Sequence, residues 1–203
     1  MTPYEQGLAE LPAEIVVNDK DIINGYTTDF RKKYTGESPA LLRPRSTDEV
    51  ASIVKLCNLH SVALVPVGGN TGYCGGATPD ESGQQLLISL QRMNKIREVD
   101  ADNLSIPVDA GCILSEIHEA AEQENLMFPL SLGSQQSCQI GGNISTNAGG
   151  VSAVRYGITR DLVLGLEVVL PDGQVLSNLS PLRKANPGYA VHPRPLGAAG
   201  SRG

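Results

Sequence analysis

Five glycines lie within nine residues, from Gly68 to Gly76, in the run Gly-Gly-Asn-Thr-Gly-Tyr-Cys-Gly-Gly. Glycine lets backbone N–H groups approach an anion without a Cβ in the way, and it permits positive φ angles. The apolar residues 62–65 just upstream predict a short buried strand, so the loop begins where a strand ends. The pattern favours a phosphate-binding loop. A glycine-rich hairpin or Ω-loop without a ligand stays open as an alternative, because glycine clusters commonly mark turns.

The spacing of these glycines separates the common phosphate motifs. A dinucleotide fingerprint needs glycines at offsets of two and five, whereas here they stand at positions 68, 69, 72, 75 and 76. No Gly-Lys pair occurs anywhere in the sequence, so a Walker A loop is excluded. The loop therefore does not belong to the nicotinamide-binding or ATP-binding classes with those motifs.

A second candidate segment covers residues 128–150 and is rich in hydroxyl, amide and glycine residues. It shows neither a helix period nor a strand period, which predicts a long loop, and long loops inside compact domains are usually functional or disordered. Its Ile, Leu and Phe content argues against disorder. The triplet Gly-Gly-Asn occurs in both segments, at 68–70 and 141–143. We therefore expect one elongated polar ligand held from two sides.

Other chemistry is weakly represented. The four cysteines, at positions 57, 74, 112 and 138, form no Cys-x-x-Cys pair and have no flanking histidines, so we expect reduced thiols and no metal site. His118-Glu119 begins a zincin-like motif, but Glu122 stands where that motif needs histidine. The histidines at 60, 118 and 192 are expected to be structural or exposed.

The elements that must position the two segments can be predicted from periodicity. A helix follows Ser46 and Glu49, which form a capping box, and its apolar residues repeat at 50, 53, 54 and 57. A second amphipathic helix is expected over 113–123. Residues 4–17 are interpreted as a further helix. The predicted extended segments are 41–44, 85–90, 95–99, 104–108, 162–170 and 174–176, the last two joined by a turn at 171–173. Pro44 is expected to confine the first of these to a sheet edge.

Composition limits the class of protein. At 203 residues and 40% hydrophobic content, the chain can form one domain or two small lobes. The formal net charge of −6 argues against nucleic acid and anionic membrane surfaces as main partners and favours small molecules. No apolar run is long enough to span a bilayer, and the start lacks the pattern of a signal peptide, so a cytoplasmic location is expected.

Two motifs in this order resemble one family. Pro-x-Gly-Gly-Asn-Thr-Gly, from Pro66, is followed by Ile-Gly-Gly-Asn-Ile-Ser-Thr-Asn-Ala-Gly-Gly, from Ile140, and then by Arg155-Tyr156-Gly157. This combination resembles the vanillyl-alcohol-oxidase-type, or PCMH-type, FAD-binding family over residues 26–189. Within that family the chain looks most like the group of D-2-hydroxyglutarate dehydrogenases, D-lactate dehydrogenases and glycolate oxidase FAD subunits. The resemblance implies an α+β, two-lobed fold that binds FAD between its lobes.

The resemblance also implies site residues. The first loop matches the family's pyrophosphate-binding positions at Pro66, Gly68, Gly69, Asn70, Thr71, Gly72, Gly75 and Gly76. The second loop matches positions along the ribityl chain and flavin ring at Ser134, Gly141, Gly142, Asn143, Thr146, Asn147 and Gly150. Val168 matches a strand position near the adenine. No residue is assigned a catalytic role.

The implied domain organisation is incomplete. Residues 1–40 form a helical lead-in, 41–84 the first FAD-binding lobe, 85–185 the second lobe, and 186–203 a divergent, disordered tail. In the family the catalytic base and the groups that bind the substrate carboxylate lie in a further domain, which is expected to be missing here together with the end of the second lobe. The implied activity is hydride transfer from C2 of a D-2-hydroxy acid to the flavin. Two alternatives stay open: a truncated, non-catalytic FAD-binding module that needs a partner chain, and another flavoprotein of this fold, such as a sugar-nucleotide reductase or a molybdenum-hydroxylase flavin subunit.

Asn70 predicts how the flavin is attached. Family members with covalent flavin commonly carry histidine at this position, and the amide of asparagine cannot act as the nucleophile that forms such a bond. We therefore expect non-covalent FAD. Denaturation of the flavin-loaded protein in acid should release all the flavin into the supernatant. Flavin absorbance that stays with the precipitated protein would contradict this expectation.

Overall fold

The computed structural model describes residues 2–179, and the chain divides into two compact units. Unit 1 consists of Met1–Met93 with Val169–Val175, and unit 2 consists of Asn94–Val168 with Leu176–Gly203. Each is described by itself. The predicted divergent tail at 186–203 lies outside the described residues. The predicted lobes, 41–84 and 85–185, were defined by the parts of FAD that each would bind. This division stays a prediction.

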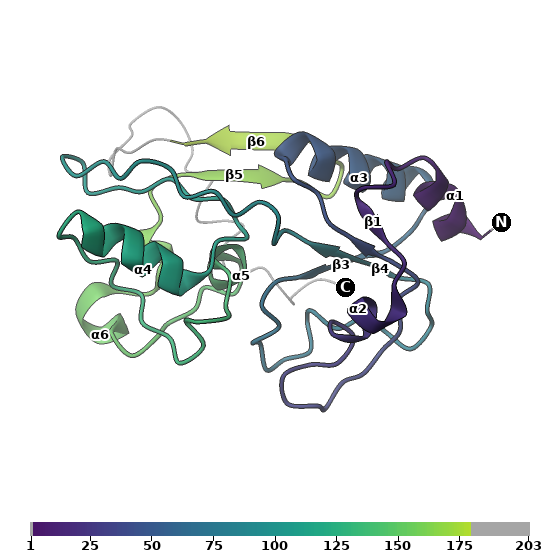
Figure 1. The fold of residues 1–203 in the computed structure, drawn as a ribbon, viewed down its shortest axis with the longest axis horizontal. Helices are drawn as coiled ribbons and strands as arrows, with labels where there is room; N and C mark the ends of the chain where they lie inside the picture. Colours follow the sequence, from purple (N-terminus) through teal and green to yellow (C-terminus); the bar gives the residue numbers. More distant parts are fainter. Residues whose placement is uncertain (1, 180–203) are drawn as a thin grey trace. The chain divides into compact units, whose positions relative to one another are not determined.

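Unit 1 is built on a four-stranded sheet of order β1-β2-β4-β3, and Figure 1 labels β1, β3 and β4 of this sheet. The inner strands β2 and β4 are parallel to each other. The edge strand β3 pairs with β4 in parallel, and the edge strand β1 pairs with β2 in antiparallel. The bounds are β1 Val16–Val17, β2 Leu41–Leu42, β3 Leu64–Val67 and β4 Leu86–Ser89. Every residue of β4 is buried, as expected for a central strand of a parallel sheet. The helices of this unit are α1 Pro3–Ala9, α2 Lys20–Asn24 and α3 Thr47–Leu59.

Helix α3 confirms the predicted apolar stripe. Ile53 and Cys57 are buried in the core cluster of unit 1, and Val50 packs against it. Half of the predicted capping box is present, because the Glu49 N–H donates to Ser46 Oγ at 3.2 Å. The Glu49 carboxylate instead accepts from the backbone N–H of Arg45 at 2.6 Å. The helix start is therefore stabilised by both side chains, but not by the reciprocal pair that the sequence suggested.

Two predictions for unit 1 were wrong. The strand at 41–44 is not at a sheet edge, since β2 lies between β1 and β4 and ends at Leu42, before Pro44. The proline of the sheet is Pro66, in the edge strand β3, where its missing N–H costs no ladder bond. The predicted helix over 4–17 stops at Ala9, because the residue before Pro12 disfavours helical backbone and the chain continues into β1.

Unit 2 contains helix α4, Leu114–Gln123, which confirms the predicted second helix. Ile117 and Ala121 are buried, and Ile117 belongs to a core cluster that also holds Cys112, Leu130 and Ile140. The predicted strands at 95–99 and 104–108 are wrong as regular strands. They face each other only through the isolated bridges Ile96↔Val108 and Asp100↔Ser105, and two separate bridges are too few for a ladder.

The predicted hairpin after residue 162 is largely confirmed. Strands β5, Leu166–Val169, and β6, Val175–Asn178, form a two-stranded sheet. The Gly173 N–H donates to the Leu170 carbonyl at 2.8 Å and closes the turn. The start of the predicted strand was wrong, because Thr159–Leu162 forms the short helix α7. Helix α6 covers Ala153–Tyr156.

The predicted loop at 128–150 contains a helix, α5, over Ile140–Ser145. Ile140 is buried and Ile144 packs against the same core, so tertiary packing overrides the poor helix propensity of the paired glycines. Gly141 lies so close to the backbone at Ala110 that its N–H donates to the Ala110 carbonyl at 2.8 Å. A Cβ at Gly141 would lie 2.9 Å from that oxygen and 2.8 Å from the Ala110 Cβ. Gly141 therefore allows the helix to pack, which is a role in folding.

Gly141→Ala and Gly142→Ala form a matched pair. Gly141→Ala should lower the free energy of unfolding by about 1–3 kcal/mol, because the added methyl overpacks the contact with Ala110. A Cβ at Gly142 meets nothing within 4 Å, so Gly142→Ala should be neutral or stabilising by up to about 1 kcal/mol through helix propensity. Urea denaturation followed by circular dichroism measures both. Equal effects of the two substitutions would contradict the packing role of Gly141.

Candidate cofactor site

The phosphate loop, residues 68–76, leaves the carboxyl end of β3 in unit 1, as predicted. Within residues 2–179, no backbone N–H from Gly68 to Ala77 donates a hydrogen bond to a protein acceptor. Pro66, Gly68, Gly69, Asn70, Thr71, Gly72, Gly75 and Gly76 all lie in this loop or the strand before it. A series of free N–H groups on one loop is a donor set for an anion, since such amide dipoles converge on negative charge.

The glycines of the loop leave space above its backbone. A Cβ at Gly72 or Gly76 would meet no atom within 4 Å. Gly75 has φ +71°, and a Cβ there would lie 2.6 Å from Cδ2 of Tyr34. Glycine is thus required at 75 by backbone and packing, whereas at 72 and 76 it keeps the loop open toward a ligand. The loop fits a pyrophosphate.

Asn70 makes a contact that the sequence did not reveal. It takes φ +49°, which asparagine tolerates better than most residues. Its Nδ2 donates to the backbone carbonyl of Thr28 at 2.7 Å. One N–H of the side-chain amide is therefore engaged by the protein, which fixes the side chain against Thr28, and the backbone N–H of Asn70 is free of protein acceptors within the described residues.

Thr78 is a residue that the sequence analysis missed. Its Oγ1 is buried and has no hydrogen-bond partner among the described residues. Thr78 lines a cavity of about 650 Å³ in unit 1, together with Lys33, Tyr34, Cys74 and Gly75. A buried hydroxyl without a partner is costly unless a ligand or water satisfies it. The sequence signal that could have identified Thr78 is its position two residues after Gly76, the last glycine of the loop.

The predicted residues of the second segment lie in unit 2, and several have structural roles. Asn143 is 4% exposed, and its Nδ2 donates to Cys138 Sγ at 3.4 Å. Asn147 Oδ1 accepts from the Arg160 N–H at 3.0 Å. Thr146 Oγ1 donates to the Gly142 carbonyl at 2.8 Å. These amides and hydroxyls hold the segment in shape.

The other predicted residues of unit 2 are Gly150, Ser134 and Val168. Gly150 has φ +78°, and a Cβ there would collide with the Ser131 carbonyl, so glycine is required by the fold. The Ser134 carbonyl accepts from the N–H groups of Ser137 and Cys138 in a tight turn. Val168 is half-buried in β5. Whether the two segments hold one ligand between them stays a prediction.

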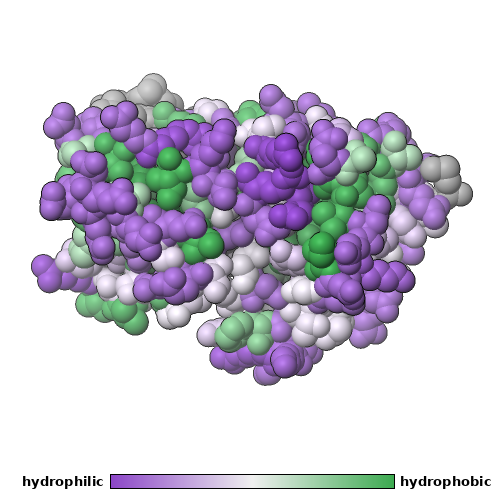
Figure 2. Space-filling model, in the orientation of Figure 1, coloured by the Kyte–Doolittle hydropathy of each residue, from purple (hydrophilic) through white to green (hydrophobic). Residues whose placement is uncertain are grey.

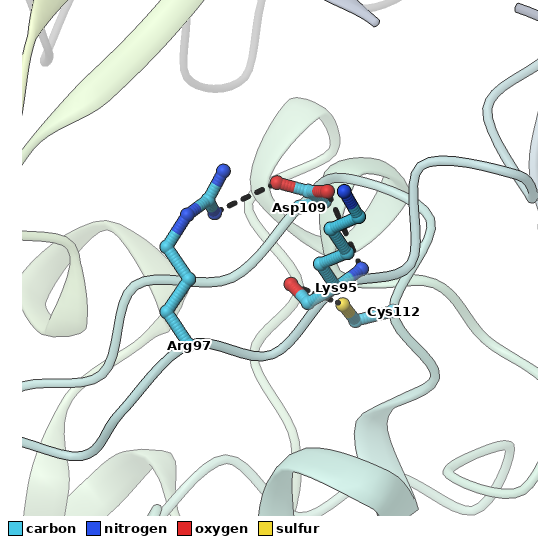
Figure 3. A network of polar contacts seen from close by, with 4 residues as sticks. All are labelled: Lys95, Arg97, Asp109 and Cys112. Atoms are coloured by element: carbon cyan, nitrogen blue, oxygen red, sulfur yellow. Dashed lines mark hydrogen bonds and ion pairs between the residues drawn. The ribbon is translucent and has the colours of Figure 1, made fainter. Parts of the chain in front are cut away.

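A network of polar contacts in unit 2 is structural (Figure 3). Asp109 accepts from Arg97 Nη1 at 2.8 Å and from the backbone N–H of Lys95 at 3.3 Å. Cys112 Sγ donates to the Lys95 carbonyl at 3.4 Å. Burial raises the pKa of the Cys112 thiol to about 11, so it is protonated and unreactive at neutral pH. The network ties residues 95–97 to 109–112.

The other residues singled out by sequence have ordinary environments. His60 Nε2 lies 2.9 Å from Glu10 Oε1, and His118 Nε2 lies 2.9 Å from the Leu130 carbonyl, which confirms structural roles for both. His192 lies outside the described residues. The four cysteines form no disulfide, and Cys74 alone among them is exposed. Between residues 2 and 179, no group of three or more His, Cys, Asp or Glu could hold a metal ion.

On the face shown in Figure 2, hydrophilic residues predominate and apolar residues form separate patches. None of the helices described has the length and apolar character needed to cross a bilayer.

Comparison with known proteins gives relatives of high similarity. The chain is 46% identical over 188 residues to a probable mitochondrial D-2-hydroxyglutarate dehydrogenase of Oryza sativa, covering 93% of this chain and 33% of that protein. It is 43% identical over 180 residues to a D-2-hydroxyglutarate–pyruvate transhydrogenase of Saccharomyces cerevisiae, covering 88% and 36%. A mitochondrial D-2-hydroxyglutarate dehydrogenase of Danio rerio is 41% identical over 189 residues, covering 92% and 35%. The chain thus spans about a third of the length of these relatives.

Solved structures show the fold. An alkyldihydroxyacetonephosphate synthase superposes with a TM-score of 0.81 at 20% identity, covering 98% of this chain and 36% of that one. A 6-hydroxy-D-nicotine oxidase from Arthrobacter nicotinovorans gives a TM-score of 0.67 at 20% identity, covering 79% and 34%. The α+β, PCMH-type fold implied by the sequence resemblance is confirmed.

The family described as FAD binding domain matches residues 38–178, which is more than half of the chain and includes both glycine-rich segments. The predicted cofactor, FAD, follows from this match and from the donor set of the phosphate loop. The chain therefore belongs to the FAD binding domain family.

Proposed function

We propose that this chain is the FAD-binding portion of a flavin-dependent D-2-hydroxy-acid dehydrogenase. The observation that carries the proposal is the phosphate loop, whose N–H groups from Gly68 to Ala77 have no protein acceptor within the described residues and whose Gly72 and Gly76 are open to a ligand. The rice, yeast and zebrafish relatives all carry D-2-hydroxyglutarate in their names, which supports a D-2-hydroxy acid as substrate. Because the chain spans about a third of those proteins, activity in this chain alone is not part of the proposal.

In this proposal the backbone from Gly68 to Gly72 donates to the pyrophosphate, Gly75 and Gly76 complete the loop, and Thr78 Oγ1 adds a hydroxyl. Ser134, the exposed face of α5 at Gly142, and the backbone of 146–150 contact the ribityl chain and ring, while Val168 lies near the adenine. When bound, FAD supplies an acceptor for hydride from the substrate C2. This chain's own residues bind and orient the cofactor. Asn70 leaves the cofactor unlinked, because its amide is no nucleophile and donates to Thr28.

A second candidate function rests on the length of the chain. Because it spans about a third of its relatives, a non-catalytic FAD-binding module that works with a partner chain is the alternative proposal. The names of the rice and zebrafish relatives place those proteins in mitochondria, so we propose a mitochondrial or cytoplasmic location.

Gly72→Val tests the phosphate loop. A Cβ added at Gly72 meets no protein atom within 4 Å, so the melting temperature of the free protein should change little. The same side chain would occupy the space of the phosphates, and the Kd for FAD should rise at least about tenfold, equivalent to 1.4 kcal/mol. Quenching of FAD fluorescence measures the Kd. Glu122→Gln is the control, since Glu122 is an exposed residue of α4 outside both glycine-rich segments. Unchanged affinity in Gly72→Val would refute this role.

The substrate class is tested with the reconstituted protein under anaerobic conditions. D-2-hydroxyglutarate, D-lactate and glycolate are added separately, with L-2-hydroxyglutarate as the stereochemical control, and flavin absorbance is followed. Bleaching by a D-2-hydroxy acid alone would support a dehydrogenase within this chain. Protein that binds FAD but is not bleached would show that this chain alone binds the cofactor without the chemistry, as both proposals allow. Protein that cannot be reconstituted would refute both.

A further inference from the structure

One turn outside the family match contacts the phosphate loop at three points. The turn covers residues 28–35, whereas the match begins at residue 38. Asn70 Nδ2 donates to the Thr28 carbonyl at 2.7 Å. The ring of Tyr34 lies against Gly75, where a Cβ would come within 2.6 Å of it. At the tip of the loop, the Arg31 guanidinium lies 4.1 Å from the centre of the Tyr73 ring, which also contacts Phe30 at 5.8 Å between centroids.

The turn is internally ordered by a buried carboxylate. Asp29 is 3% exposed and accepts three backbone N–H groups: Lys33 at 2.6 Å, Tyr34 at 2.7 Å and Arg31 at 3.0 Å. These bonds, that from Tyr34 foremost, lower the pKa of Asp29. Since the bonds favour the charged form, their contribution is complete above the ordinary carboxyl pKa and is lost as the pH falls through the lowered value. At neutral pH the turn is therefore fully bonded.

Three aromatic residues of the turn and the loop lie on the surface and not in the core. Phe30 is 61% exposed, Tyr73 56% and Tyr34 52%. Large aromatic side chains left this exposed contribute little to folding, because most of their area stays in water. Their contacts are with one another, with Arg31 and with Gly75. These contacts therefore act on the conformation of the phosphate loop more than on the stability of unit 1.

The loop needs such support because its own backbone provides little. Within the described residues, Thr78 N–H to the Gly75 carbonyl, at 3.0 Å, is the one backbone hydrogen bond made inside residues 68–78. Glycine also has the largest backbone entropy to lose on ordering. A loop that must present free N–H groups cannot use them to hold itself, so its order has to come from side chains packed on it.

We propose that the turn at 28–35 is a brace that holds the phosphate loop in its ligand-binding conformation, with Asn70 and Tyr34 as positioning residues. The inference rests on the proposed binding of FAD by this loop. Asn70 fixes the first half of the loop through Thr28, and Tyr34 fixes the second half by covering Gly75. Neither side chain needs to touch the cofactor. The brace acts by reducing the entropy that the loop loses when the ligand binds.

The test uses Asn70→Gly and Tyr34→Ala in the full chain. Glycine at 70 retains the positive φ and removes the amide donor, but it also adds backbone entropy to the loop. Tyr34→Ala leaves the loop's own residues unchanged and is therefore the decisive variant. Each substitution should raise the Kd for FAD about tenfold, the effect of losing one hydrogen bond or packing contact of the usual strength. Lys32→Gln is the control, because Lys32 is an exposed residue of the same turn and, within the described residues, its side chain makes no hydrogen bond, ion pair or cation–π contact with the loop. It should change the Kd less than about twofold.

A second measurement reads the loop directly, without cofactor. Cys74 lies in the loop and is exposed, whereas Cys57, Cys112 and Cys138 are buried, and burial raises the pKa of the Cys57 thiol to about 11. A nitroxide spin label should therefore attach at Cys74. Its spectrum should show greater mobility in Asn70→Gly and Tyr34→Ala than in the parent chain or Lys32→Gln.

The two measurements separate the possible failures. If the parent chain does not bind FAD, the proposed function fails, and label mobility alone decides on the brace. Unchanged mobility in both variants would overturn the brace whatever the affinity. Increased mobility with unchanged affinity would also overturn it, because the ordering of the loop would then have no part in binding.

Discussion

Unit 1 is organised around backbone N–H groups that must stay free of protein acceptors. Folding normally pairs such groups, and a loop that leaves a whole series unpaired loses the bonds that would order it. The sheet is the first element that orders the loop. The loop leaves β3, which is held along its length by β4, itself buried on both faces. A rigid strand end thus fixes where the loop begins.

Side chains are the second element that orders the loop. Asn70 combines two properties, since it accepts a positive φ and carries a donor that reaches the Thr28 carbonyl. Tyr34 packs where Gly75 leaves room for its ring. The same small number of residues therefore keeps the loop ordered and leaves its N–H groups available. Asparagine at position 70 also lacks the nucleophilic character needed for covalent attachment of a flavin.

Glycine is needed for different physical reasons in the two segments, although both contain the triplet Gly-Gly-Asn. In the phosphate loop, Gly72 and Gly76 are open to solvent. In α5, Gly141 is in close contact with the Ala110 backbone, and Asn143 is buried against Cys138. A triplet that occurs in two segments therefore does not give its residues the same role in both. Of the seven predicted residues of the second set, five have structural roles within unit 2: Gly141, Asn143, Thr146, Asn147 and Gly150.

Local sequence signals determined the parts of this protein that depend on neighbours in the chain. The stripe of α3 at Ile53 and Cys57, the strand β4, the turn at Gly173 and the glycine loop after β3 all follow from period, caps and turn residues, and the motif order indicated the FAD-binding family. Tertiary structure alone decided the rest. The interior place of β2, the helix at the paired glycines and the engagement of Asn70 by Thr28 depend on residues distant in sequence. Periodicity carries no information about such contacts, because they arise only when the packed backbone brings the partners together.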